Sequence, residues 1–121
     1  MGEPLDKHPY PQHSRSQPLT LDVENGVFVY VLRDSIIHVL PDGPHRHPKI
    51  LGNGHAVDYA GDLTMKQRII IDLTNLSGTF ICDAPDGLLQ VAHHLEQLGF
   101  IISEGGIRYF PHNGSRPQIL N

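Results

Sequence analysis

The alternation of apolar and polar residues over AVDYAGDLTM, residues 56–65, constrains the fold more than any other feature of the chain. Successive side chains of a β-strand point to opposite faces, so this alternation predicts a strand that is buried on one face only. The residues expected on the buried face are Val57, Tyr59, Gly61, Leu63 and Met65. The backbone of such a strand needs a neighbour to pair with, and the following residues supply one.

RIIIDLTNL, residues 68–76, contains the β-branched residues that favour strands. Lys66-Gln67 is expected to turn the chain back, so that residues 56–76 form an antiparallel hairpin. In its second strand the residues predicted to face the core are Ile69, Ile71 and Leu73. The residues predicted to face away are Asp72 and Thr74.

Further strands are expected on both sides of this hairpin. LTLDV and VFVYVLR are separated by Asn25-Gly26, a pair that accepts the positive φ angles of a type I′ turn, which predicts a first hairpin. RDS then leads into a third strand, SIIHVLP. Near the C-terminus FIIS, IRYFP and QIL are expected to be short strands, with Gly105-Gly106 as a turn.

One helix is predicted after Cys82. Asp83 is the expected N-cap, Pro85 suits the first turn, and Asp86 places a negative charge where the helix dipole favours it. Gly99 is expected to end the helix as the residue after its C-cap. The apolar stripe at helical spacing consists of Leu88, Val91, Ala92, Leu95 and Leu98.

These elements predict an α+β domain in which an antiparallel sheet of about six to seven strands, arranged in hairpins, packs against one main α-helix. Residues 19–121 are expected to form this single domain. Residues 1–18 contain four prolines among polar residues and are predicted to be a flexible N-terminal arm, because they offer too little apolar surface to offset the entropy of ordering.

Charge and cysteine content narrow the classes of function. The formal net charge is −4, and the nine Lys and Arg residues are dispersed, which argues against binding to nucleic acid or to an anionic membrane. Cys82 is the only cysteine, so no intramolecular disulfide can form. The N-terminal residues contain no apolar run, so no secretory signal is expected there. We therefore expect a cytoplasmic protein, either a monomer or a homodimer, with a protein or a small molecule as its partner.

The chain has nine histidines, and several of them fall close together. His45 and His47 are two residues apart, which places both rings on one face of an extended chain. His55, with an oxygen ligand from Asp58 or Asp62 and with His38 nearby, would complete the ligand set of a zinc or non-haem iron site. The alternative is an exposed histidine-rich loop. We predict no cofactor and keep a divalent metal site as the alternative.

The polar segment Asn75-Leu76-Ser77-Gly78-Thr79 follows directly on the second strand of the hairpin. A serine before a glycine can act as a nucleophile, but the G-x-S-x-G elbow is absent. One interpretation is a bulge or kink whose side chains bond to the local backbone. The other is a ligand site formed by Asp62, Asn75, Ser77, Gly78 and Thr79. His94 lies opposite the apolar stripe of the helix and is interpreted as part of a solvated face.

The layout H-P-x-x-L-G-x-G-x-x-V-x-x-A-G-D-L, then N-x-S-G-T-F, then a helix resembles a small C-terminal domain of bacterial polymorphic-toxin-like proteins. It is also similar to part of the plant IQ-motif calmodulin-binding family, and its form N-L-S-G-T-F resembles stand-alone bacterial relatives. The resemblance spans residues 47–100. It implies that Ala60-Gly61-Asp62 and residues 75–80 lie side by side.

The chain departs from that pattern at two positions. Thr79 and Phe80 stand where the N-x-S-G-H-Y pattern has histidine and tyrosine. Threonine has no pKa near neutrality and cannot replace histidine as a general acid or base. The resemblance therefore favours a binding or interaction module, with its ligand between residues 60–62 and 75–79 and with His47 and His55 at the rim.

Two other classes of function remain as alternatives. The first is a toxin-related hydrolase or transferase, metal-assisted through His45, His47 and His55. The second is a structural subunit that self-associates through an exposed strand edge.

Overall fold

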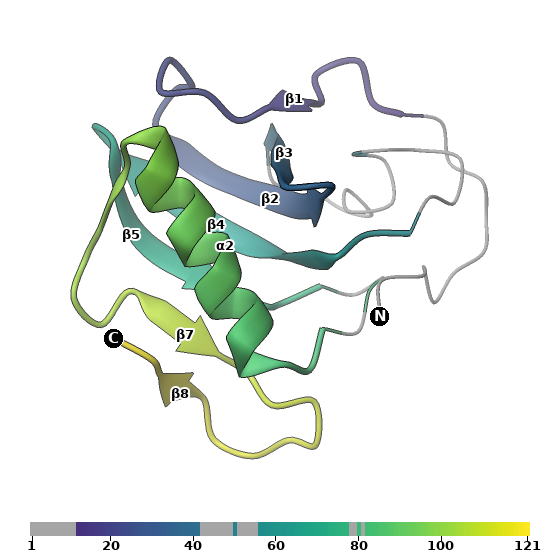
Figure 1. Ribbon diagram of the computed structural model, residues 1–121, viewed down its shortest axis with the longest axis vertical. Helices are drawn as coiled ribbons and strands as arrows, with labels where there is room; N and C mark the ends of the chain where they lie inside the picture. Colours follow the sequence, from purple (N-terminus) through teal and green to yellow (C-terminus); the bar gives the residue numbers. More distant parts are fainter. Residues whose placement is uncertain (1–11, 42–49, 51–55, 78–79, 81) are drawn as a thin grey trace.

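The computed structural model describes residues 12–41, 50, 56–77, 80 and 82–121. Within these residues eight strands form one sheet, and helix α2 (Pro85–Leu98) packs against it, so the α+β class is confirmed. Figure 1 shows α2 lying across strands β4 and β5. No helix in the described ranges is long and apolar enough to cross a membrane.

The strands run across the sheet in the order β1-β3-β2-β4-β5-β7-β8, and β6 also pairs with β5. Their bounds are Gln17–Pro18 for β1, Gly26–Arg33 for β2, Ile36–Pro41 for β3, Tyr59–Lys66 for β4, Ile69–Thr74 for β5, Ile101–Ile102 for β6, Ile107–Tyr109 for β7 and Gln118–Ile119 for β8. Strand β1 comes from the last residues of the predicted arm.

The first hairpin differs from the prediction. Residues 19–25 form no strand, and Gly26 already belongs to β2. The tight turn lies instead between β2 and β3, where Asp34 and Ser35 have φ angles of 51° and 64°. Arg33 pairs with Ile36 across this turn, which is the geometry of a type I′ hairpin. A polar pair without glycine therefore takes the left-handed conformation that Asn25-Gly26 was expected to supply.

The central hairpin is confirmed, with one correction to the residues that it buries. Its turn residues are Gln67 and Arg68, both with positive φ. In β5, Ile70 and Leu73 are buried, whereas Ile69 and Ile71 are exposed. The reason is a β-bulge: Met65 pairs with Ile70 and Thr64 with Asp72, so Ile71 has no partner in β4. One extra residue reverses the faces to which the two halves of the strand point.

Thr74 was also predicted to face away from the core, and this was wrong, because its residue exposure is only 1%.

The sheet also differs from the prediction in that it is not purely antiparallel. Strands β6 and β7 both run parallel to β5 and pair with its two ends, Ile69-Ile70 and Leu73-Thr74. A parallel partner requires a crossover connection, and α2 lies in this one, between β5 and both strands.

Helix α2 begins and ends close to the predicted positions. The N-cap is Ala84 rather than Asp83, and no side chain caps it, but Pro85 occupies the first turn as expected. Gly99 ends the helix with a φ of 107°. The buried residues of the helix are Leu88, Val91, Ala92 and Leu95. Leu98 was predicted in this stripe, but it is 43% exposed.

Candidate functional site

The backbone that leaves β5 passes directly over Gly61 of β4. A Cβ atom added to Gly61 would lie 1.9 Å from the carbonyl oxygen of Thr74 and 2.9 Å from the Cα of Asn75. Tyr30, which pairs with Gly61 from β2, donates its hydroxyl to the same carbonyl oxygen at 2.7 Å. We call these four residues, Tyr30, Gly61, Thr74 and Asn75, the crossing. Of the expected proximity between residues 60–62 and 75–80, the approach of Gly61 to Asn75 is observed.

The side chain of Asn75 is buried, and its hydrogen bonds within the described ranges go to backbone atoms. Its amide nitrogen donates to the carbonyl oxygens of Cys82 at 2.8 Å and Phe110 at 2.9 Å. Its amide oxygen accepts the backbone N–H of Phe110 at 2.7 Å. Asn75 therefore holds together the end of β5, the segment before α2 and the end of β7, since a buried backbone polar group needs a partner.

The neighbouring polar side chains of Thr74 and Ser77 also form hydrogen bonds to the backbone. The hydroxyl oxygen of Thr74 accepts the backbone N–H groups of Asp62 at 3.3 Å and Leu76 at 3.1 Å. The hydroxyl oxygen of Ser77 accepts the N–H of Phe80 at 3.1 Å. Gly78 and Thr79 lie outside the described residues. The described part of the N-L-S-G-T segment thus bonds to backbone, both near and far along the chain.

Most residues of the predicted metal site, His45, His47 and His55, lie outside the described residues. Asp58 is described, and its carboxylate accepts the N–H of Asp34 at 2.9 Å, which ties the start of β4 to the β2–β3 turn. His38, in β3, is partly buried, and this burial, followed by the charge of Arg33, lowers the pKa of its imidazole. Within the described ranges no three His, Cys, Asp or Glu side chains gather as metal ligands.

A groove runs between helix α2 and the β2–β3 turn. It consists of two adjoining cavities of about 410 Å³ and 220 Å³, which share Ser35 and His94 as lining residues. The larger cavity is also lined by Leu32, Val57, Asp58, Tyr59, Gly87 and Gln90. The smaller cavity is also lined by Leu19, Ile36, Ile37, Gln97 and Leu98. We call this feature the α2 groove.

The helix contributes a row of polar side chains to the α2 groove. Gln90, His94 and Gln97 are spaced at i, i+4 and i+7 and therefore share one face of the helix. In the described part of the chain none of these three side chains makes a hydrogen bond, and the ring of His94 lies 6.4 Å from that of His93 between centroids. The sequence interpretation placed His94 on a solvated face and overlooked the two glutamines, although their spacing was visible.

Tyr59 forms the floor of the larger cavity. Its ring lies so close to Gly87 that a Cβ at that position would be 2.4 Å from a ring carbon, and its hydroxyl donates to the carbonyl oxygen of Ala84 at 2.9 Å. Burial is the main cause that raises the pKa of this phenol, so the ring stays neutral. Glycine at position 87 thus lets the helix approach β4 and fixes the shape of the groove.

Ser35, His94 and Asp58 line the same cavity, which prompts comparison with a hydrolytic triad. In such a triad the carboxylate bonds to the histidine and the histidine to the serine. Here the Asp58 carboxylate bonds to the backbone of Asp34, and no hydrogen bond links His94 to Ser35 in the described residues. The hydrogen bonds of these three residues within the described ranges therefore differ from those of a triad. Comparison of the chain with models of protein families, with curated proteins and with solved structures finds no match.

Proposed function

We propose that this protein is an interaction module whose α2 groove binds a short extended peptide segment of a partner protein. The observation that carries the proposal is the row formed by Gln90, His94 and Gln97, which lines both cavities and bonds to nothing in the described chain. An extended peptide presents both N–H and C=O groups. A glutamine amide can donate to one and accept from the other.

The length of the row fits a short peptide. Gln90 and Gln97 are seven residues apart, which corresponds to about 10.5 Å along a helix axis at 1.5 Å per residue. An extended chain rises about 3.3 Å per residue, so about three peptide residues would span the row. Three residues present two side chains to one face, and the groove has two cavities to receive them.

The two cavities differ in character, which predicts a sequence preference. The smaller one is bordered by Ile36 and Leu98, which are 49% and 43% exposed, so it suits an apolar side chain. Asp58 lines the larger cavity, and its carboxylate accepts the backbone N–H of Asp34. Arg33 donates to the carbonyl oxygen of Ala56 at 3.1 Å and forms an ion pair with Asp34 at 3.7 Å, and neither contact engages the carboxylate of Asp58. We therefore expect a lysine or arginine at the position that enters the larger cavity.

The proposal is tested by selecting heptapeptides from a random display library against the tag-free protein and titrating the selected peptide into isotope-labelled protein. We expect the amide and side-chain resonances of Ser35, Gln90, His94 and Gln97 to shift. His94→Ala should weaken binding about tenfold, because it removes the group shared by both cavities.

His93→Ala is the matched control, because it removes the same side chain one residue earlier, and His93 does not line the groove. Its affinity for the peptide should stay within about twofold of the wild type, a difference well under the 1.4 kcal/mol of a tenfold change. The proposal is wrong if the library yields no binder, or if the selected peptides shift resonances elsewhere and bind His94→Ala as well as the wild type.

A further inference from the structure

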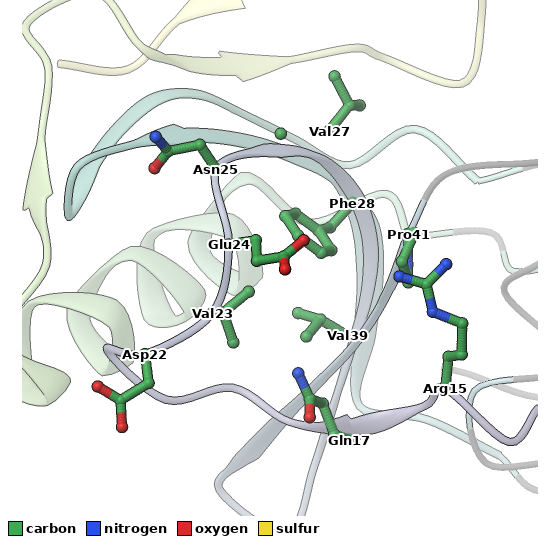
Figure 2. Close-up of a pocket in the computed structure, with 11 residues that line it drawn as sticks. Arg15, Gln17, Asp22, Val23, Glu24, Asn25, Val27, Phe28, Val39 and Pro41 are labelled. Carbon is green, nitrogen blue, oxygen red and sulfur yellow. The ribbon is translucent and has the colours of Figure 1, made fainter.

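A third cavity, of about 490 Å³, lies at the opposite end of β2 from the α2 groove and shares no lining residue with it. It lies between the segment before β2 and the strands β2 and β3 (Figure 2). Its apolar surface is formed by Val23, Val27, Phe28, Val39 and Pro41. We call it the loop cavity. Its volume falls within the range of small-molecule sites in proteins.

Hydrogen bonds hold the wall of the loop cavity in place. The N–H of Leu19 donates to Ile37 of β3 at 2.8 Å where the segment begins. At its end the side-chain oxygen of Asn25 accepts the N–H of Gln67 at 2.7 Å, which joins the segment to the β4–β5 turn. Both ends of the segment are therefore anchored to the sheet.

Polar groups of opposite charge line the loop cavity. Glu24 and Asp22 come from the segment before β2, and Arg15 and Gln17 come from the residues in and next to β1. Figure 2 shows Glu24 pointing from this segment toward Phe28, with Arg15 on the other side, beside Pro41. In the described ranges the side chains of Glu24 and Arg15 form no ion pair; the pairs there join Arg33 to Asp34 and Arg108 to Asp72.

From this arrangement we propose that the loop cavity binds a small zwitterion with an apolar body, of the size of an amino acid or a dipeptide. The ammonium group pairs with Glu24 and the carboxylate with Arg15. The apolar side chain lies on Phe28 and Val39, which are 7% and 1% exposed and form the floor. Gln17 can donate to or accept from the polar middle of the ligand. A cation or an anion alone leaves one of the two protein charges without a partner.

The test uses calorimetric titration of the tag-free chain with leucine and with leucyl-leucine. N-acetyl-leucyl-leucine, which lacks the ammonium group, and leucyl-leucine methyl ester, which lacks the carboxylate, are the comparison ligands. We expect saturable binding of at least one zwitterion and about tenfold weaker binding of both blocked forms, because each loses one charge-assisted hydrogen bond.

Two variants test which protein side chain binds each charged group of the ligand. Glu24→Gln should weaken binding of the zwitterion about tenfold yet leave the affinity for the N-acetyl form unchanged. Arg15→Gln should weaken binding of the zwitterion about tenfold and leave the affinity for the methyl ester unchanged. Glu104→Gln, an exposed carboxylate outside the cavity, should change neither. The inference is overturned if no zwitterion binds saturably, if a blocked form binds as tightly as the free one, or if both variants retain wild-type affinity. His94→Ala should bind the zwitterion normally, which separates this site from the α2 groove.

Discussion

The crossing and the α2 groove both contain polar side chains, but those side chains differ in whether they are hydrogen-bonded within the described chain. At the crossing, Tyr30 and Asn75 are buried, and their side chains bond to backbone atoms that lie 7 to 44 positions away in the sequence. In the groove, Gln90 and His94 make no hydrogen bond within the described chain. The residue types alone do not separate the two cases. The partner of each hydrogen bond does: it assigns the first region to folding, and for the second it supports the proposed binding of a peptide.

The largest effect on stability is expected at Gly61, and it tests whether the crossing serves the fold. Gly61→Ala is expected to lower the free energy of unfolding by about 4 kcal/mol, because the new Cβ would meet the Thr74 carbonyl, which Tyr30 holds in place. Urea denaturation measures the loss. Gly114→Ala is the control, since its Cβ would have no heavy atom within 4 Å and only its φ of 83° is unfavourable. That control should lose about 1 kcal/mol. Equal losses in the two variants would show that the crossing tolerates a side chain.

The next largest effect is expected at Asn75. Asn75→Ala leaves the carbonyl oxygen of Cys82 and both backbone groups of Phe110 without this partner, and it should lower the free energy of unfolding by about 3 kcal/mol. Asn113→Ala removes the same side chain from an exposed turn, where within the described ranges it accepts the N–H of Ser115. We expect about 0.5 kcal/mol for that variant. If both substitutions cost the same in thermal and urea unfolding, Asn75 does not hold the three segments together.

The smallest effect is expected in the α2 groove. The double substitution of Gln90→Ala and Gln97→Ala should change the free energy of unfolding by less than about 0.5 kcal/mol, since both side chains are exposed and alanine favours the helix. The same variant should lose peptide binding, which titration with the selected heptapeptide measures. A stability loss above about 1 kcal/mol would mean that the glutamines serve the fold, and the contrast with the crossing would disappear.

Local signals in the sequence predicted the elements that depend on local chemistry. The alternation over residues 56–65 predicted β4, and Pro85 and Gly99 marked the ends of α2, because a strand's faces and a helix's ends follow from neighbouring residues. The bulge at Ile71 was not predicted. Its position depends on how β4 pairs with β5, so the same isoleucines fit either face until the register is known.

Long-range contacts explain the remaining errors. The parallel pairing of β5 with β6 and β7 depends on where α2 returns the chain, which no short segment specifies. The bonds of Asn75 to Phe110 join residues 35 positions apart, so the sequence showed a polar segment but not its partners. The row of Gln90, His94 and Gln97 was readable from its spacing. It was overlooked because a polar helix face is usually solvated.

The sequence separation at the crossing also bears on how long the folded state lasts. Tyr30 and Thr74 are 44 positions apart, and Asn75 reaches Phe110 only after the helix and β7 have returned to the sheet. Interactions that form after the rate-limiting step slow unfolding and leave the rate of folding almost unchanged. We expect the Asn75 hydrogen bonds to be of this kind, so that they lengthen the lifetime of each folded molecule without helping the chain to reach its fold sooner.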